Sequence, residues 1–296
     1  MSTPNWKRKI ASRLQALTVW LMMLMGWEAA YRVIDWKPWV FPAPSHIVDA
    51  GLSMLGYRTA LGEPIGPGWP LVIPGVDPEA SAPSPGILRS PLVTAMAVSG
   101  VRLAVGFSAS LLLGIVLGIA LWRLSFINSL FGPVCLGMQT LPSVCWVPLA
   151  ILTFGINEKG VLFVLIMGSA FSMAIATRDG LRALPPIYRA AGRMLGAKGV
   201  RLYTSVLLPA SLPALAGTLR QGFSFSWRSL LGAELILLTQ RRGLGFLLNM
   251  GRDFSDIAQV FAVMVVMVAV GIAMDRWVFA RIELRVRTRF GLLASR

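Results

Sequence analysis

The residues of this chain that could do chemistry are charged side chains inside apolar segments. Four arginines occupy such positions: Arg32, Arg102, Arg220 and Arg228. An unpaired charge near the middle of a membrane helix costs about 2.5–3.5 kcal/mol on insertion scales, so it ordinarily faces a cavity or an opposite charge. For Arg228 two interpretations stay open: contact with an anionic solute, or a buried ion pair with Glu234 or Glu28. Arg102 is expected to be a paired structural charge.

No catalytic or metal-binding constellation accompanies these arginines in the sequence. The chain has one histidine and two cysteines, Cys135 and Cys145, which a helix would separate by about 15 Å, too far for a disulfide. It contains neither a zinc-protease nor a nucleophile-elbow motif. The stretch 192–198 does not satisfy the phosphate-loop pattern G-x-x-x-x-G-K-S/T, and no strand is expected before it. We therefore expect no catalytic residue, no metal and no bound cofactor. If ATP and Mg²⁺ are used, a separate subunit must bind them.

The composition is that of an integral membrane protein. Of 296 residues, 55% are hydrophobic and 14% charged, and the mean hydropathy is +0.68, values that exclude an ordinary water-soluble domain. The net charge of +15 could suggest a nucleic-acid partner. However, most basic residues outside the apolar segments fall on one side of the expected spans, which predicts that both termini are cytoplasmic. The charge is thus a topology signal, and no nucleic-acid partner is expected.

Apolar length predicts an all-α membrane protein with about six spans, because a bilayer core of about 30 Å needs about 20 helical residues. The spans are expected at 14–34, 93–121, 127–154, 161–177, 212–238 and 257–279. The third is interrupted by Pro133, Pro142 and Pro148. Residues 14–280 then form one transmembrane domain between a cytoplasmic tail, 1–13, and a basic cytoplasmic tail, 281–296. Within that domain 35–92 is an external loop and 178–209 a cytoplasmic loop.

Polar and amphipathic side chains of the third and fifth spans could line a pathway with Arg228. They are Gln139, Ser143, Trp146, Ser224, Trp227 and Glu234. The prolines of the third span free backbone carbonyls, which is tolerated only against protein or water. The alternative for each hydroxyl taken singly is a hydrogen bond between helices, and this alternative is slightly favoured.

The loop 178–209 predicts a short amphipathic helix, from a start at Pro185 and Pro186 to a stop at Gly196. Its apolar residues recur at helical spacing: Ile187, Ala190, Ala191, Met194 and Leu195. Arg189 and Arg193 share another face. Such a helix could lie on the bilayer or on its own protein. Its alanines make a poor membrane anchor and a good close-approach surface for another protein.

The sequence of this loop resembles a segment that is typical of a known protein family. The loop is similar to the coupling segment of permease subunits of bacterial ATP-binding-cassette importers, in particular the nitrate, sulfonate, taurine and bicarbonate branch. The matching positions are Tyr188, Ala190, Ala191, Leu195, Gly196, Ala197, Leu208 and Pro209, and Gly192 lies within the same segment. One position departs, because Arg189 stands where the family has a Glu that helps to fix the coupling helix. Further matches follow in order along the chain: Phe41 to Ser45, Ser99 and Arg102, Leu141 and Pro142, and Gly243 to Gly245.

The resemblance implies a fold like that of type I importer permeases, a place in the inner membrane, and a role in ATP-driven uptake. The chain would pair with a second permease copy, dock on two ATPase subunits and receive a small, anionic solute from an external binding protein. Residues 188–196, with Leu208 and Pro209, would form the ATPase coupling segment. The competing interpretation is a membrane scaffold that docks an ATPase without conducting a solute.

Overall fold

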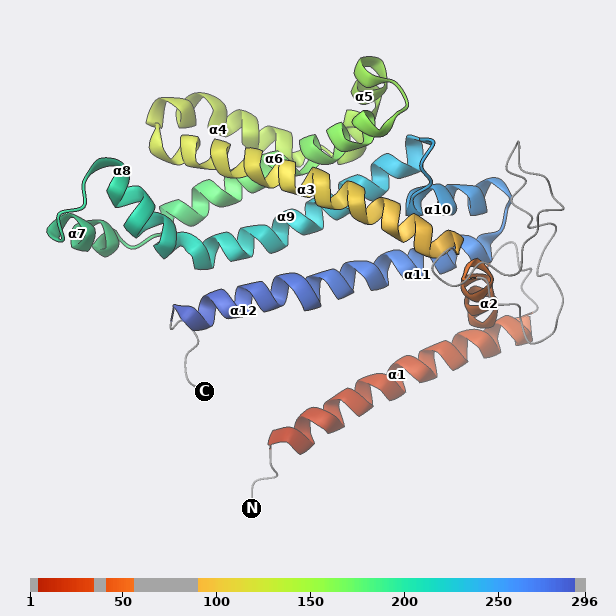
Figure 1. Ribbon diagram of the computed structural model, residues 1–296. Helices are drawn as coiled ribbons and strands as arrows, with labels where there is room; N and C mark the ends of the chain where they lie inside the picture. Colours follow the sequence, from red (N-terminus) through yellow and green to blue (C-terminus); the bar gives the residue numbers. More distant parts are fainter. Residues whose placement is uncertain (1–4, 35–40, 56–89, 291–296) are drawn as a thin grey trace. The chain divides into compact units, whose positions relative to one another are not determined.

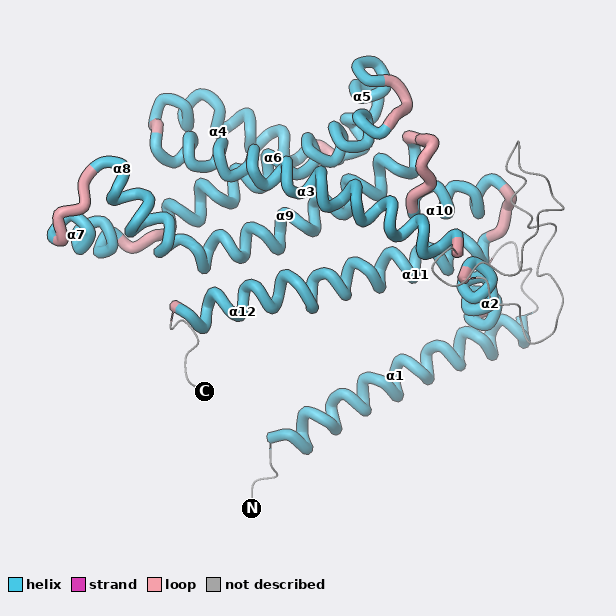
Figure 2. Tube along the Cα trace, in the orientation of Figure 1, coloured by secondary structure: helices cyan, strands magenta, loops and turns pink. Residues whose placement is uncertain are grey.

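The computed structural model describes residues 5–34, 41–55 and 90–290. By its internal contacts the chain divides into two compact units. The first comprises Met1–Thr94 and Leu247–Val265, and the second comprises Ala95–Phe246 and Val266–Arg296. Over the described residues, Figure 2 shows only helices and the loops that connect them. The all-α expectation is therefore confirmed for these parts of the chain.

The first unit is organised around the end of its long N-terminal helix. Helix α1 (Asn5–Ile34) precedes a short helix, α2 (Pro44–Met54). Glu28 of α1 accepts hydrogen bonds from the Ser45 backbone N–H, at 3.2 Å, and from the Ser45 hydroxyl, at 3.1 Å. A carboxylate at this position satisfies the free N–H groups of a helix start. The ring of Trp27 also stacks on Phe41, with centroids 4.9 Å apart.

The second unit is a bundle of long helices with shorter ones at its ends. Its elements, some beginning or ending in the first unit, are α3 (Pro91–Arg123), α4 (Ser125–Thr140), η3 (Ser143–Trp146), α5 (Val147–Phe154), α6 (Glu158–Arg182), α7 (Pro186–Met194), α8 (Gly199–Leu202), η4 (Tyr203–Leu207), α9 (Leu208–Ile236), α10 (Leu244–Asp253), α11 (Ile257–Met274), η5 (Asp275–Phe279) and α12 (Ala280–Arg289). In Figure 1, α7 and α8 lie at the end of this unit where α9 begins, and α5 lies at the opposite end.

Small residues allow α3, α6 and α9 to pack closely. A Cβ at Gly118 of α3 would come within 2.6 Å of the Ala174 carbonyl oxygen of α6. A Cβ at Gly180 of α6 would lie 3.1 Å from the Ala214 methyl of α9. Without a hydrophobic driving force between helices in lipid, small residues permit the close backbone approach that van der Waals packing requires. These three helices therefore provide the frame on which the loops are mounted.

The third expected span is not one continuous helix. Helices α4 and α5 are joined through η3 and bend by 106°. Pro142 N-caps η3 and Pro148 lies in the first turn of α5. Because proline lacks an N–H and disfavours helical geometry in the preceding residue, the two prolines break the span where the sequence predicted an interruption. The size of the bend was not predictable from the positions of the prolines.

The other helices that correspond to expected spans follow in the expected order and are longer than expected. Within the described residues, α3, α6 and the continuous helix from Ile257 to Arg289 are long and apolar enough to cross a membrane, as is the bent α4–α5 pair taken together. Helices α1 and α9 have the necessary length but a less apolar sequence. Most of the expected external loop, 35–92, and residues 1–4 and 291–296 of the tails lie outside the described residues.

Two segments of π-helix interrupt the regular helices. Segment η4 joins α8 to α9, and η5 joins α11 to α12. Such segments contain an additional residue in one turn and often occur at functional sites. Segment η4 links the cytoplasmic-loop helices of the sequence analysis to the long helix that carries Arg228.

Candidate functional site

Arg102 of α3 lies at the centre of a buried ionic network. Its side chain is 5% exposed. The guanidinium donates to Glu234 of α9 at 2.7 Å and, through two nitrogens, to Glu158 of α6 at 2.6 and 2.7 Å. The Ser99 hydroxyl lies 2.8 Å from a Glu234 carboxylate oxygen. The expectation that Arg102 is a paired structural charge is confirmed, and charge-assisted bonds of this kind are the stronger ones in proteins.

The same network holds the connection between α9 and α10. Arg102 also donates to the Thr239 hydroxyl at 2.6 Å and to the Arg241 carbonyl at 2.7 Å. The backbone N–H of Leu244 donates to Ser99, and that of Gly245 to Glu234, at 2.9 and 3.0 Å. The loop 237–243 is thereby fixed to three helices. It cannot move independently of them without exposing or unpairing buried charges.

Arg228 lies apart from that network, on an exposed face of α9. Its Nε donates to the Ser224 carbonyl at 3.1 Å, and its guanidinium lies 4.9 Å from the Phe225 ring centre. Over the described residues no carboxylate forms an ion pair with it. Glu234 and Glu28, its two suggested partners, instead pair with Arg102 and Arg32. The interpretation of Arg228 as a buried ion pair with either residue is therefore not supported.

The exposed face of α9 continues toward the break in the third span. Ser224, Arg228 and Gly232 follow one another at four-residue spacing, which places them on one helix face. A Cβ at Gly232 would lie 3.4 Å from Val144 and 3.8 Å from the Ser143 hydroxyl of η3. The structure thus places Ser143 close to the face that carries Arg228.

The other pathway candidates lie elsewhere. Glu234 is 2% exposed, within the Arg102 network, and Trp227 is 9% exposed. Trp146 packs against Phe171 and Phe163, and Gln139 is half-buried near the end of α4. Of the candidates, Arg228 is exposed, and the half-buried Ser224 and Ser143 lie on or beside the same face of α9.

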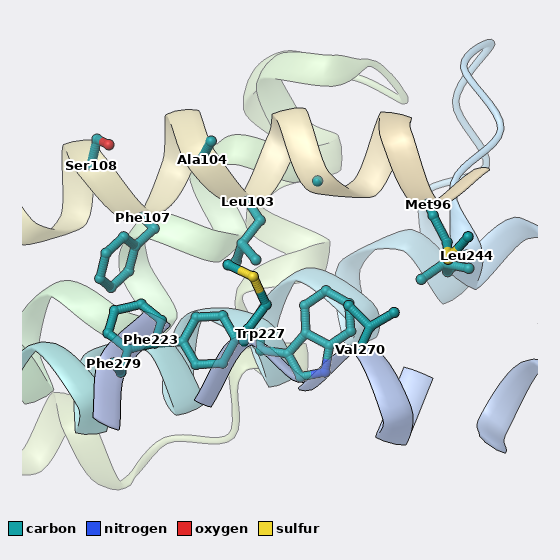
Figure 3. A pocket seen from close by; sticks show the side chains of 12 residues that line it. Met96, Leu103, Ala104, Phe107, Ser108, Phe223, Trp227, Leu244, Val270 and Phe279 are labelled. Atoms are coloured by element: carbon teal, nitrogen blue, oxygen red, sulfur yellow. The ribbon is translucent and has the colours of Figure 1, made fainter. Parts of the chain in front are cut away.

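Trp227 lines a mainly apolar cavity between α3, α9 and the C-terminal half of α11. The cavity has a volume of about 300 Å³. In Figure 3 the rings of Phe107, Phe223, Phe279 and Trp227 point into it, and Ser108 lies at its edge with its hydroxyl directed away from the rings. No charged side chain lines the cavity. It therefore offers no site for an anion.

Helix α7 presents its apolar residues outward. Ile187, Met194 and Leu195 are 69%, 86% and 87% exposed, and Tyr188, Ala190 and Ala191 are exposed beside them. Proline at the start and a positive φ of 80° at Gly196 after the end bound the helix, as the sequence predicted. Leu208 and Pro209 follow at the start of α9.

The opposite side of α7 packs closely on its own unit. Gly192 is buried, and a Cβ there would come within 2.6 Å of Leu202 and 3.2 Å of Val206. Arg189, three residues earlier, lies over the Trp122 ring of α3, with its guanidinium carbon 5.1 Å from the ring centre. Arg189 departs from the pattern of the resembling family, which the sequence alone shows. Its contact with Trp122 could not be predicted, because nothing local in the sequence connects two residues so far apart.

Comparisons with known proteins identify the family. Residues 110–288 match the model of the binding-protein-dependent transport system inner membrane component. A protein of Methanocaldococcus jannaschii named as an ABC transporter permease is 30% identical over 70% of this chain and 79% of its own length. The nitrate import permease protein of Synechocystis is 28% identical over 60% of this chain and 64% of its own length. Others are named as bicarbonate and taurine transport permeases.

A solved structure supports the fold. The inward-facing MetNI methionine ABC transporter contains a chain that aligns with a TM-score of 0.53, at 20% identity, over 66% of this chain and 95% of that chain. The type I permease-like fold that the resemblance implied is therefore confirmed. The chain belongs to the family of inner-membrane components of binding-protein-dependent transport systems and is the translocation subunit of such a transporter.

Proposed function

We propose that this chain forms half of the translocation pathway for a small inorganic or organic anion, with Arg228 as the residue that attracts it. The observation that carries the proposal is the exposed guanidinium of Arg228 on α9, without an ion-paired carboxylate among the described residues. A charge held in an apolar helix and left accessible is a site for an opposite charge. Guanidinium groups match carboxylate, nitrate-like and sulfonate oxygens with two parallel donors.

A second copy of the chain would complete the pathway. In a symmetric dimer, a residue near the twofold axis meets its own copy, so two Arg228 side chains would form a positive ring around the solute. Ser224 and Ser143, on or beside the same face of α9, add hydroxyl groups that bind anions as donors. The names of relatives that import nitrate or bicarbonate support a small anion as the solute.

Helix α7 would receive the force from ATP hydrolysis. We infer that its exposed apolar side, Ile187, Met194 and Leu195 with Ala190 and Ala191, docks into a groove of a separate ATPase subunit, one for each permease copy. Exposed apolar patches of this kind mark protein interaction sites. The α7 end then lies on the cytoplasmic side with both chain termini, and the Arg102 network lies on the side where a binding protein delivers solute.

Transport by charge variants tests the proposal. The permease, its ATPase and its binding protein are reconstituted in vesicles, and uptake of labelled nitrate, bicarbonate and taurine is measured. Arg228→Gln should reduce uptake at least tenfold, whereas Arg228→Lys should retain a substantial part, because the charge is kept. Arg252→Gln, which removes an exposed charge of α10, serves as the control and should transport normally. Equal uptake by all three variants would refute an electrostatic role for Arg228.

The same vesicles test the docking helix. Ala191→Glu places a charge on the exposed side of α7, so ATP hydrolysis should no longer be stimulated by the loaded binding protein. If the wild-type complex hydrolyses ATP but takes up none of the solutes offered, nor the ligand identified for its binding protein, the chain is a non-conducting scaffold. That outcome would refute the translocation pathway while leaving the ATPase contact intact.

A further inference from the structure

Two aromatic rings with a cationic side chain on each outer side form a row between α7, the end of α3 and η4. Starting from α7, Arg189 covers the Trp122 ring, and the Trp122 ring meets Tyr203 of η4 edge to face, with centroids 5.4 Å apart at 82°. The Arg123 guanidinium in turn lies 4.3 Å from the centre of the Tyr203 ring. These four side chains, Arg189, Trp122, Tyr203 and Arg123, are called the cation–aromatic row below.

The geometry of each contact is attractive. The face of an aromatic ring carries negative charge density and its edge positive density, so a cation over a face and an edge directed at a face are both favoured. Both guanidinium groups lie within about 6 Å of a ring centre, the range in which this attraction is significant. The two rings are half-buried, while the two arginines are exposed.

The row connects three elements that must move together if α7 is to transmit force to the long helices. Trp122 and Arg123 end the long helix α3, Tyr203 lies in η4 at the approach to α9, and Arg189 belongs to α7. No carboxylate forms an ion pair with Arg189 among the described residues, so the row is the polar attachment of α7 that the structure shows. Position 189 is also where the resembling family carries an acidic residue.

We propose that the cation–aromatic row is the device that fixes the coupling helix α7 to the ends of α3 and α9, with Arg189 as the positioning residue. The proposal rests on the proposed function for its consequence, the transmission of force, but not for the attachment itself. A guanidinium on a ring face needs a positive charge at 189, so the attachment would not tolerate the family's Glu. An anion there would meet the negative face of Trp122.

The attachment is tested by a distance measurement that does not depend on the ATPase. Spin labels are introduced with Ser125→Cys and Arg193→Cys, in a chain whose native cysteines carry Cys135→Ala and Cys145→Ala. The unchanged row should give one narrow distance distribution. Arg189→Met and Arg189→Glu should both broaden it, because each releases α7. Arg189→Lys, which keeps the cation, should restore most of the narrow component.

Variants of the two rings supply a second, independent set of changes, which are measured with the same pair of spin labels. Tyr203→Phe and Trp122→Phe keep an aromatic face, so the distribution of label distances should stay nearly as narrow as in the unchanged row. Tyr203→Leu and Trp122→Leu remove that face and should broaden the distribution. Each lost contact should shift the ratio of attached to released α7 by about two- to fivefold. If one leucine variant does not fold, the other and the exposed Arg189 variants still decide the question. Narrow distributions for both Arg189→Met and Arg189→Glu would overturn the proposal.

The number of solute molecules imported per ATP hydrolysed distinguishes a failure of this proposal from a failure of the proposed function. In the reconstituted complex, the number of solute molecules imported per ATP should fall about two- to fivefold in Arg189→Met and recover in Arg189→Lys. A broadened distance distribution with unchanged coupling supports the row as the attachment of α7 and refutes α7 as the docking helix. An unchanged distribution with reduced coupling overturns the row, because Arg189 would then act directly on the ATPase.

Discussion

The two ends of the bundle formed by α3, α6 and α9 hold their connecting loops by different chemistry. At one end Arg102 and Glu234 are almost completely buried, and the ion pair is surrounded by hydroxyl and backbone groups that complete its hydrogen bonds. At the other end Arg189 and Arg123 are exposed, and they rest on the faces of Trp122 and Tyr203. No carboxylate takes part in this second contact.

The difference implies that the two ends differ in how easily they rearrange. Removing one partner of a buried ion pair costs about 3–5 kcal/mol, since the other charge stays buried and unpaired. A cation on an exposed ring contributes about 0.5–1 kcal/mol and tolerates sliding over the ring surface. We therefore expect the Arg102 end to behave as a rigid joint and the α7 end as an adjustable one.

The largest effect is expected from Arg102→Met. This variant leaves Glu234 buried without a cation, so the free energy of unfolding should fall by about 3–5 kcal/mol. Thermal unfolding of the purified protein in detergent, followed by size-exclusion fluorescence, measures the loss. Arg102→Lys should not restore stability, because a single ammonium cannot reach Glu158, Glu234 and the Arg241 carbonyl together. Wild-type stability in Arg102→Met would contradict the rigid joint.

A smaller effect is expected from Gly192→Val at the α7 end. The new side chain would meet Leu202 and Val206, and such overpacking typically costs about 1–3 kcal/mol. Because the contact lies between α7 and its own unit, the variant should displace α7 and reduce coupling more than global stability. Gly217→Ala, at a glycine with no neighbour within 4 Å, is the matched control. A loss of stability as large as that of Arg102→Met would remove the distinction between the two ends.

The smallest effect is expected from Arg220→Gln. Arg220 pairs with Asp275 through two bonds of 2.6 Å, yet its side chain is 45% exposed. Arg220 is expected to lie nearer the cytoplasm than Arg228 and to extend its charged end to water. Ion pairs exposed to water contribute about 0.2–1 kcal/mol and weaken as salt screens them. Unfolding in low and high salt should show a small difference that salt removes. A large, salt-independent loss would show that burial is not what separates the Arg102 network from other ion pairs in this chain.

Local features of the site could be predicted from the sequence. The bounds of α7 depend on Pro186 and Gly196, whose conformational preferences act within a few residues. The four-residue spacing of Gly114 and Gly118 in α3 is likewise typical of helices that pack closely. In the same way, the position of Arg102 within an apolar segment indicated a paired charge, because an unpaired charge is too costly there.

Long-range pairing could not be predicted. Glu234 is separated from Arg102 by 132 residues, and a single sequence contains no signal that joins them. Proximity along the chain suggested Arg228 instead, six residues from Glu234, but the two lie on different faces of α9. For the same reason Arg189 could be identified as a departure while Trp122, its partner, could not. The 106° bend at η3 joins α4 and α5, which both contact α6, and no local feature of the sequence measures such an angle.

Segment η4 has a consequence for how the transporter could change over evolution. One π-turn contains a residue more than an α-turn, so deleting a single residue within 203–207 would restore a regular helix. Each residue of an α-helix turns the chain by about 100°. Because the π-turn takes up the additional residue, such a deletion would leave α8 and α9 nearly in the same rotational register, whereas a deletion in a regular helix would rotate its two parts by that amount. A one-codon insertion or deletion at η4 would thus add or remove the joint in front of α9 without turning the exposed apolar side of α7 in another direction.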